Sequence, residues 1–243
     1  MSLAHRAGPG AATTAADVLT GVLADALTAP GGTFTLRAAL DGRVDPVRAL
    51  GALRASGADV LLPFLVAGHP LTPGDAALVR AAVTAFPAPA PGAPEGAAWA
   101  LRDAALTRAL AVLGVPTHDW EGLATHRLTA LTETTSLPDP AAWTAWGAEA
   151  ARLSTLASPP VTGTCRTRFR EHAPTLTRGL VHAILRHDHL AAARIARWLA
   201  LDAAGAPDPL LPAALTHLAA LGPHPPRTLF ELAVARRLLG GAG

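Results

Sequence analysis

Residues 166–202 read RTRFREHAPTLTRGLVHAILRHDHLAAARIARWLALD, and this stretch indicates the fold most clearly. Alanine and leucine recur at helical spacing, and Asp188 has the character of a helix cap. The pattern therefore predicts one helix over 174–187 and a second over 189–203. Because their connection is short, we expect the two helices to be antiparallel neighbours. The stretch also holds four of the ten histidines and seven arginines.

The composition of the whole chain favours helix. Half of the 243 residues are apolar, which places the chain far from the disordered class and allows a sizeable core, in one domain or two small ones. Alanine and leucine supply most of that half, while aromatic residues amount to 4%. Alanine and leucine are strong helix formers, whereas β-branched and aromatic residues favour strands. We therefore expect a mainly α protein, built as an antiparallel multi-helix bundle or a short helical array.

The charged residues narrow the classes of function. All 20 basic residues are arginine, and lysine, tyrosine and asparagine are absent, which is typical of a very GC-rich genome such as an actinobacterial one. Without lysine or tyrosine, the chain has no Schiff-base or P-loop lysine and no tyrosine general acid. The net charge of +2 is too small to indicate a nucleic-acid binder.

Cysteine usage and hydropathy predict a soluble cytoplasmic protein. The chain has one cysteine, so it can form neither an internal disulfide framework nor a multi-cysteine zinc site. Its first residues are too broken by glycine, proline and charge for a secretory signal. The strongest apolar run, VLLPFLVAG at 60–68, is too short to cross a bilayer, so no membrane contact is expected.

A proline- and alanine-rich segment divides the sequence. PAPAPGAPEG at 87–96 offers few side chains for packing, so it is interpreted as a linker or surface loop. It separates an N-terminal α(+β) subdomain, 1–86, from an all-α domain, 97–243. Further helices are predicted after it; they lie near 97–113, 118–132, 140–157, 164–172, 209–221 and 226–239.

The N-terminal part contains the two convincing strand candidates. Residues 1–13 are expected to be a mobile tail, and helices are predicted over 14–29 and 72–86. TFTLRAAL and ADVLLPFLVAG flank a helix that starts at Asp45-Pro46 and stops at Gly57. Strand, helix and strand in this order would form a small βαβ-like element near 33–66. The alternative is that both apolar runs are buried helix segments.

The C-terminal hairpin superficially resembles one repeat of the tetratricopeptide type. HDHLAAARIARWLALD places alanines at 192 and 196 and a leucine at 199, much as the second helix of such a repeat does. The resemblance covers some thirty residues of 174–203, and no 34-residue recurrence follows it. It supports an antiparallel helix pair and implies no family.

A cationic stripe on the first helix of this hairpin is the candidate site. On a helical wheel Arg178, His182, Arg186 and His189 fall within a sector about 80° wide, and the rest of the circumference is apolar. Such a helix is expected to be central to its bundle. Facing a cavity, Arg178 and Arg186 would bind a carboxylate or phosphate, while His182 and His189 would act in acid–base catalysis. Facing water, the stripe would be a solvated helix face.

Other polar groups are weaker candidates. Cys165 falls in the first turn of a predicted helix, where a thiolate is favoured, and Glu171 lies near its end; an incidental cysteine is the simpler interpretation. His187 is expected at a helix end. His187 and His189 diverge on a helix, so no metal site is predicted, and no cofactor either.

Two functions compete on these observations. The first is a small cytoplasmic enzyme of bacterial accessory or specialised metabolism, which would act on an anionic small molecule or modified peptide by Arg/His-assisted acid–base chemistry. Lyase, isomerase or cyclase chemistry would need no cofactor. The second is a non-catalytic helical module that binds a protein or peptide. A homodimer is compatible with either. What separates them is whether the stripe formed by Arg178, His182 and Arg186 lines a concave pocket or the outer surface.

Overall fold

The computed structural model describes residues 14–29, 33–90, 92–132, 137–203 and 208–241. Within these ranges the protein is mainly α, as predicted, and contains no strand. The N-terminal half comprises α1 (Ala15–Thr28), α2 (Leu36–Leu40), α3 (Pro46–Ser56), the 3-10 helix η1 (Gly57–Leu61), α4 (Leu62–Val66), α5 (Pro73–Ala85), α6 (Gly96–Val112) and α7 (Arg127–Ala130). The C-terminal half comprises α8 (Trp143–Arg152), the 3-10 helix η2 (Ser154–Leu156), α9 (Thr164–Glu171), α10 (Ala173–Leu185), α11 (His189–Leu201), α12 (Leu210–Ala220) and α13 (Pro226–Gly240).

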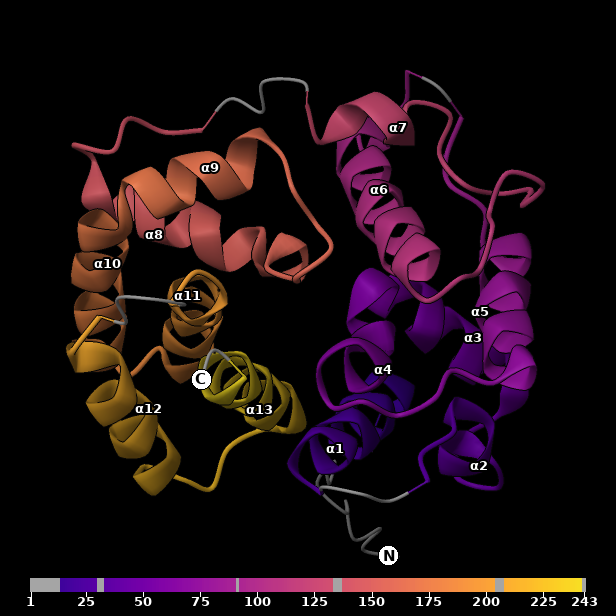
Figure 1. Ribbon diagram of the computed structural model, residues 1–243, viewed down its shortest axis with the longest axis horizontal. Helices are drawn as coiled ribbons and strands as arrows, with labels where there is room; N and C mark the ends of the chain where they lie inside the picture. The colour runs from indigo at the N-terminus through magenta and orange to yellow at the C-terminus, as the bar shows by residue number, and fades with distance from the viewer. Residues whose placement is uncertain (1–13, 30–32, 91, 133–136, 204–207, 242–243) are drawn as a thin grey trace, which may run out of the picture.

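The two halves lie side by side (Figure 1). Helix α13 of the C-terminal half packs along α1 of the N-terminal half, so the first and last helices form the seam between them. Helix α11 packs against α8, α10, α12 and α13 and is the central helix of the C-terminal half. Helices α10 and α11 form the predicted hairpin, and α8 packs on both of them. Helix α10 lies at the outer edge of the C-terminal half (Figure 1).

Short sequence signals set the starts of the N-terminal helices. The side chains of Thr14, Asp45 and Thr72 each accept a hydrogen bond from a backbone N–H in the first turn of α1, α3 and α5. Such caps satisfy N–H groups that have no partner within the helix. The starts of α3 and α5 therefore confirm the helix starts predicted from Asp45-Pro46 and Thr72-Pro73, and α1 confirms the helix predicted over 14–29.

The predicted βαβ-like element is wrong, because both apolar runs form helix segments; the second is buried, as the alternative expected, and the first is only partly buried. Within 33–40 the chain forms the short helix α2 (Leu36–Leu40), which Thr35 caps, and residues 57–66 form η1 followed by α4. Pro63 lies in the first turn of α4, where its missing N–H costs no hydrogen bond. All residues from Ala58 to Phe64 are buried, so the continuous apolar run reflects a helix covered on every side.

The helix predicted over 118–132 is also wrong, since only α7 forms there. Gly122 has a positive φ of 93°, and a Cβ at this position would lie 2.6 Å from the Val83 carbonyl oxygen. The Gly122 carbonyl accepts a hydrogen bond from the Ala88 N–H, and the Ala124 N–H donates to Asp103. These backbone groups therefore form hydrogen bonds with distant segments instead of the bonds of a helix.

The proline-rich segment has no regular structure in its described residues before Gly96, which begins α6. Its described residues are exposed or partly buried, and the Ala88 N–H donates a hydrogen bond to the Gly122 carbonyl oxygen. Buried side chains from both sides of this loop belong to one continuous hydrophobic cluster. The division into domains at 87–96 stays a prediction.

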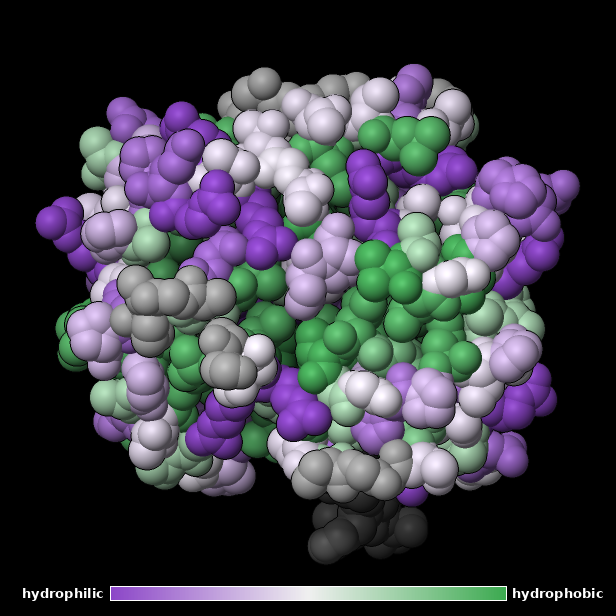
Figure 2. Space-filling model, in the orientation of Figure 1, coloured by the Kyte–Doolittle hydropathy of each residue, from purple (hydrophilic) through white to green (hydrophobic). Residues whose placement is uncertain are grey.

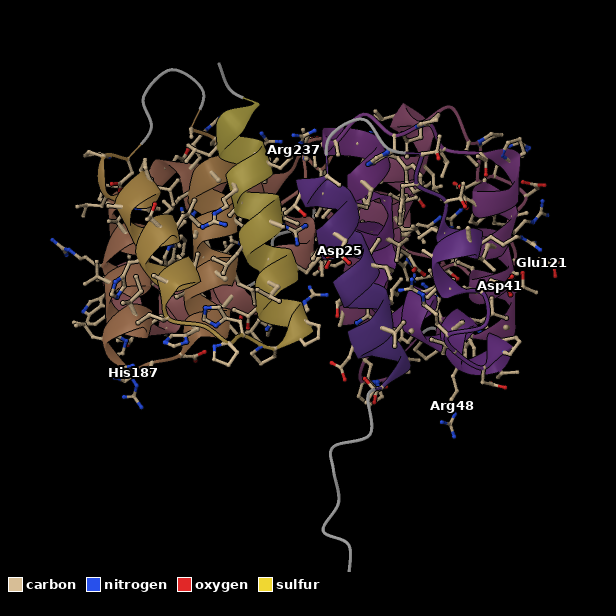
Figure 3. The ribbon with its side chains drawn as sticks, turned by 90° about the horizontal axis from the view of Figure 1, so that it is seen from below. Asp25, Asp41, Arg48, Glu121, His187 and Arg237 are labelled. Carbon is tan, nitrogen blue, oxygen red and sulfur yellow. The ribbon has the colours of Figure 1, made fainter. Side chains whose placement is uncertain are left out.

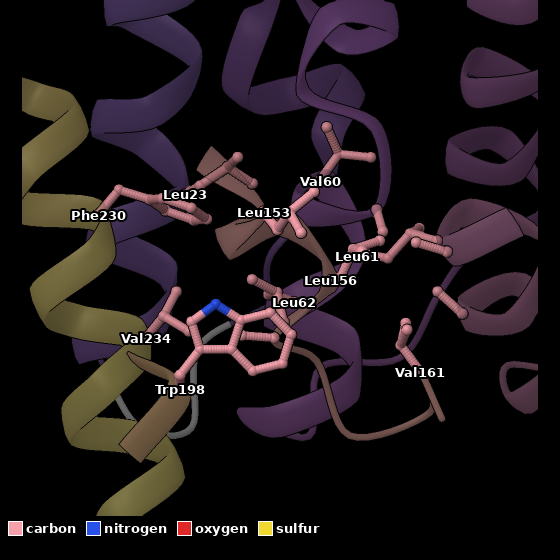
Figure 4. Packing of buried hydrophobic residues seen from close by; sticks show 14 of the residues in the cluster. Leu23, Val60, Leu61, Leu62, Leu153, Leu156, Val161, Trp198, Phe230 and Val234 are labelled. Atoms are coloured by element: carbon pink, nitrogen blue, oxygen red, sulfur yellow. The ribbon is translucent and has the colours of Figure 1, made fainter. Parts of the chain in front are cut away.

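Apolar side chains from both halves meet at the seam. Figure 4 shows Val60, Leu61 and Leu62 of the η1–α4 segment facing Leu153, Leu156, Trp198, Phe230 and Val234. On the face seen in Figure 2, apolar groups gather towards the middle, and hydrophilic ones lie around the edge. Burial of apolar surface contributes about 25 cal/mol per Å², so this shared core holds the halves together.

A buried ionic network crosses the same seam. Arg197 on α11 donates to Asp59 on η1 at 2.8 Å and to Glu231 on α13 at 3.1 Å. Arg227 contacts the same two carboxylates at 2.6 and 2.7 Å. Asp59, Arg197 and Glu231 are fully buried, so their charges need these partners.

One helical run in the described residues, 46–66, has the length and hydropathy of a membrane span. It consists of α3, η1 and α4, and 72% of its most apolar window is buried inside the protein. Mostly buried core helices of soluble proteins have the same character, so the run is compatible with a soluble protein.

Candidate functional site: the outer face of α10

The chain turns sharply between α10 and α11. Helix α10 ends at Leu185, with Arg186 as its C-cap, and His187 has a positive φ of 57°. The Asp188 side chain then accepts a hydrogen bond from the Ala191 N–H at the start of α11. A non-glycine residue in the left-handed region is uncommon, and here it reverses the chain within three residues. His187 therefore lies at a helix end, as expected, and Figure 3 shows its side chain pointing outward.

The cationic stripe divides at this turn. Arg178 and Arg186 are exposed, and His182 between them is half-buried. His189 does not continue the stripe, because it begins a new helix after the turn. The structure therefore brings Arg178, His182 and Arg186 onto one face and places His189 elsewhere.

The same face of α10 carries exposed apolar side chains. Val181 is 43% exposed and Leu185 is 73% exposed. The wheel predicted a helix central to its bundle; that expectation is wrong, because α10 packs mainly on α8 and α11 and leaves this face to solvent. Together with the stripe, Val181 and Leu185 form an outward sector about 140° wide. We call these five residues the α10 face; they are Arg178, Val181, His182, Leu185 and Arg186.

A hollow of about 170 Å³ adjoins the α10 face. Its floor lies where α8 and α10 cross, and an added Cβ at Gly179 would stand 3.2 Å from Gly147 Cα. His182 and Arg186 line the hollow, and Arg178 does not. The other lining residues include Thr144, Asp188 and Ile195.

The His182 imidazole is held by an aromatic contact. Its ring lies edge-on to Trp143, with 5.0 Å between the ring centroids. Among the described residues no hydrogen-bond partner orients either ring nitrogen. A general base is normally oriented by a third group, so this geometry suits ligand contact better than proton transfer. The Arg186 guanidinium beside it can bind a carboxylate through two parallel hydrogen bonds.

His189 belongs to a different group of imidazoles. Its ring centroid lies 5.2 Å from that of His224 and 6.0 Å from that of His187. His189 Nε2 is buried without a hydrogen bond, while His224 Nε2 lies 2.6 Å from the Leu218 carbonyl oxygen. No metal-binding group of His, Cys, Asp and Glu side chains occurs within the described ranges.

The two secondary candidates lie apart from the α10 face. Cys165 is in the first turn of α9, as predicted, and it is 6% exposed; Gly163 occupies the cap position. Glu171 ends the same helix and is exposed. Neither residue lines the hollow beside His182.

Sequence reasoning missed a larger hollow of about 650 Å³ between α9, α10, α11 and α12. Asp202 and Asp208 line it, and Asp208 directly precedes the helix predicted near 209–221. The one signal in the sequence was Asp202, a carboxylate that ends an apolar helix. Which residues surround it depends on the packing of four helices.

The chain matches no protein-family model, no curated protein and no solved structure.

Proposed function

We propose that this protein is a helical binding module that takes an acidic, apolar-bearing segment of a partner protein on the α10 face. The observation that carries the proposal is the exposure of Leu185, at 73%, between Arg178 and Arg186. Adjacent exposed apolar residues flanked by charge are typical of interaction surfaces. The single cysteine further supports a protein of the cytoplasm.

The chemistry of the face selects the partner. Val181 and Leu185 stand one helical turn apart, so they match apolar residues of a partner helix at the same spacing. Burying an exposed leucine side chain contributes about 1.5–3 kcal/mol. The arginines on either side favour aspartate or glutamate in the partner, and the hollow beside Arg186 gives one such side chain a recess.

A peptide selection tests the proposal. Random 15-residue peptides displayed on phage would be selected on the immobilised protein, and the dissociation constants of synthetic winners measured by fluorescence anisotropy. We expect acidic residues together with leucine or phenylalanine in the winners, and at least about tenfold weaker binding to Leu185→Ser. Leu128→Ser is the matched control, because Leu128 on α7 is 69% exposed but lies in the other half.

Two outcomes would contradict the proposal. Winners that bind Leu185→Ser as tightly as the wild type would show that the α10 face is a solvated surface. Self-association that Leu185→Ser abolishes, measured by sedimentation velocity, would assign the face to a second copy of the chain.

The acid–base enzyme is the second candidate, and one observation favours it. His182 and Arg186 line the same hollow, so an anionic small molecule bound by Arg186 would lie beside an imidazole. A screen of small carboxylates and phosphates by thermal unfolding would test this. A compound that stabilises the wild type but not Arg186→Ala, and is converted by the wild type but not by His182→Ala, would favour the enzyme.

A further inference from the structure

The hollow between α9, α10, α11 and α12 has a rigid apolar wall. Phe169, Leu176, Trp198 and Leu199 line it. The Trp198 indole N–H donates to the Ala150 carbonyl oxygen at 2.8 Å, and its ring centroid lies 4.7 Å from that of Phe169. Because these rings are fixed by packing and by a hydrogen bond, the wall is preformed. The volume of the hollow, about 650 Å³, lies in the range of small-molecule sites.

The rim carries one carboxylate and one guanidinium that have no ion-pair partner among the described residues. Asp202 is neutralised by Arg166, which donates to it at 2.8 and 3.2 Å. Asp208 accepts the Leu210 N–H at 2.9 Å through Oδ1 and the Thr177 hydroxyl through Oδ2, but it contacts no cation. Arg170 on α9 is exposed, and its guanidinium forms no hydrogen bond with a described residue. Each oxygen of Asp208 keeps a lone pair for a further donor.

We infer that this hollow binds a small zwitterion with an apolar body, namely an apolar amino acid or a very short apolar peptide. The ammonium group would lie on Asp208, the carboxylate on Arg170, and the apolar body against Phe169, Leu176 and Trp198. Arginine binds carboxylates through paired hydrogen bonds, and aspartate accepts from ammonium. The hollow lies at the N-terminal end of α10, and none of its lining residues belongs to the α10 face, so the site is independent of the proposed binding module.

Isothermal titration calorimetry with four ligands tests the charge pattern. These are L-phenylalanine, the dipeptide Phe-Leu, phenethylamine and hydrocinnamate. We expect at least one of the two zwitterions to bind with a dissociation constant below about 1 mM, and the amine and the acid to bind at least about tenfold more weakly. Which of the two zwitterions binds more tightly shows whether the ligand is a free amino acid or a short peptide. Equal binding of the amine or the acid, or no binding of either zwitterion, would overturn the inference.

Matched variants test the two rim charges. Asp208→Asn removes the charge and keeps an oxygen for the Leu210 N–H; Asp139→Asn is the control, because Asp139 also precedes a proline and accepts the N–H two residues on at 2.8 Å. Arg170→Gln is paired with Arg168→Gln, which changes an exposed arginine of α9 that does not line the hollow. We expect Asp208→Asn and Arg170→Gln each to bind the zwitterion at least about tenfold more weakly than the wild type. The two control variants should bind it as the wild type does.

The controls keep the result interpretable. Thermal unfolding of each variant shows whether it folds; if Asp208→Asn does not, Arg170→Gln decides the question, because its side chain is exposed. Rim variants that bind the zwitterion as the wild type does would overturn the inference. None of these variants touches Leu185 or Arg186, so peptide binding on the α10 face should stay unchanged.

Discussion

Arg197 Nη2 lies 2.8 Å from Asp59 Oδ1, although 138 residues separate the two in the chain and both side chains are fully buried. Arg197 also donates through Nε to the Ala157 carbonyl oxygen at 2.8 Å. The guanidinium thus satisfies groups from η1, α13 and the segment after η2 at one point. A buried ion pair adds little net stability over a well-packed apolar core, so we expect this network to act mainly by specifying one arrangement of the halves. The network joins η1 of one half to α11 and α13 of the other.

Removing this guanidinium should destabilise the fold strongly. Arg197→Met keeps much of the side-chain volume but leaves Asp59 and Glu231 with Arg227 as their main cation. We expect the free energy of unfolding to fall by about 3–5 kcal/mol, since the change breaks a buried pair. Urea denaturation followed by circular dichroism measures it.

Arg152→Met is the control for that experiment. Arg152 contacts Glu149 at 2.6 Å, but its side chain is 55% exposed, so the loss should stay below about 1 kcal/mol. Similar losses in the two variants would show that the seam does not depend on the buried network.

The network also predicts how stability depends on pH. Burial by itself would raise the pKa of Asp59, but Arg197 and Arg227 outweigh it and hold the pKa below its ordinary value near 3.8. Between the folded and unfolded pKa values the unfolded chain binds the additional proton, so the stabilisation is present above pH ~4 and is lost as the pH falls through the folded pKa.

Asp59→Asn should lose this dependence. Its free energy of unfolding should lie below that of the wild type at pH 7, and the difference should narrow at pH ~3. Urea denaturation of both proteins at pH 7 and at pH ~3 measures the difference in free energy of unfolding at each pH. A constant difference would mean that Asp59 does not contribute through its charge.

Two glycines bring α8 and α10 close enough to shape the hollow beside His182. A Cβ added at Gly179 would lie 3.2 Å from Gly147 Cα, which is backbone and cannot move aside. Gly179→Ala should therefore lower the free energy of unfolding by about 1–3 kcal/mol. Gly21→Ala in α1 meets nothing within 4 Å and should raise it by about 0.5–1 kcal/mol. Thermal unfolding compares the two; stabilisation by both would show that the crossing can widen.

Local signals explain which parts of the fold could be predicted from the sequence. Caps at Asp45 and Asp188 predicted helix starts because their hydrogen bonds form within the same turn. The segment around Gly122 was misread because its backbone bonds to Ala88 and Asp103, partners distant in the chain. The apolar run after Gly57 was ambiguous because burial on all sides removes the periodicity that separates helix from strand.

The site was predictable only along one helix. The wheel placed Arg178, His182 and Arg186 together, since their spacing alone decides that. It could not show that Leu185 faces solvent, because the neighbours of α10 decide which apolar positions are covered. His189 was misplaced on the wheel, since a left-handed residue at 187 breaks the helix first.

Cys165 offers a test of the weaker candidate. The thiol is 6% exposed and lies outside the hollow beside His182. Cys165→Ser should leave peptide binding, and any turnover, largely unchanged, and the native thiol should react with a disulfide reagent far more slowly than in denaturant. Loss of activity in a folded Cys165→Ser variant would instead make Cys165 a nucleophile.

The last prediction concerns the arginines of the α10 face. Arg186 lines the hollow and Arg178 does not, so their contributions to peptide binding should differ. Arg186→Ala should weaken binding by about 1.5–3 kcal/mol, as expected for a hydrogen bond to a charged group, and Arg178→Ala by at most about 1 kcal/mol, as for an exposed ion pair. His182→Ala should weaken binding without altering the charge preference of selected peptides; a larger effect on turnover than on binding would favour the enzyme. Fluorescence anisotropy at low and high salt measures all three variants. Equally small effects of all three substitutions on peptide binding would show that the α10 face is a solvated surface. Neither the arginine charges nor the hollow beside His182 would then contribute to recognition.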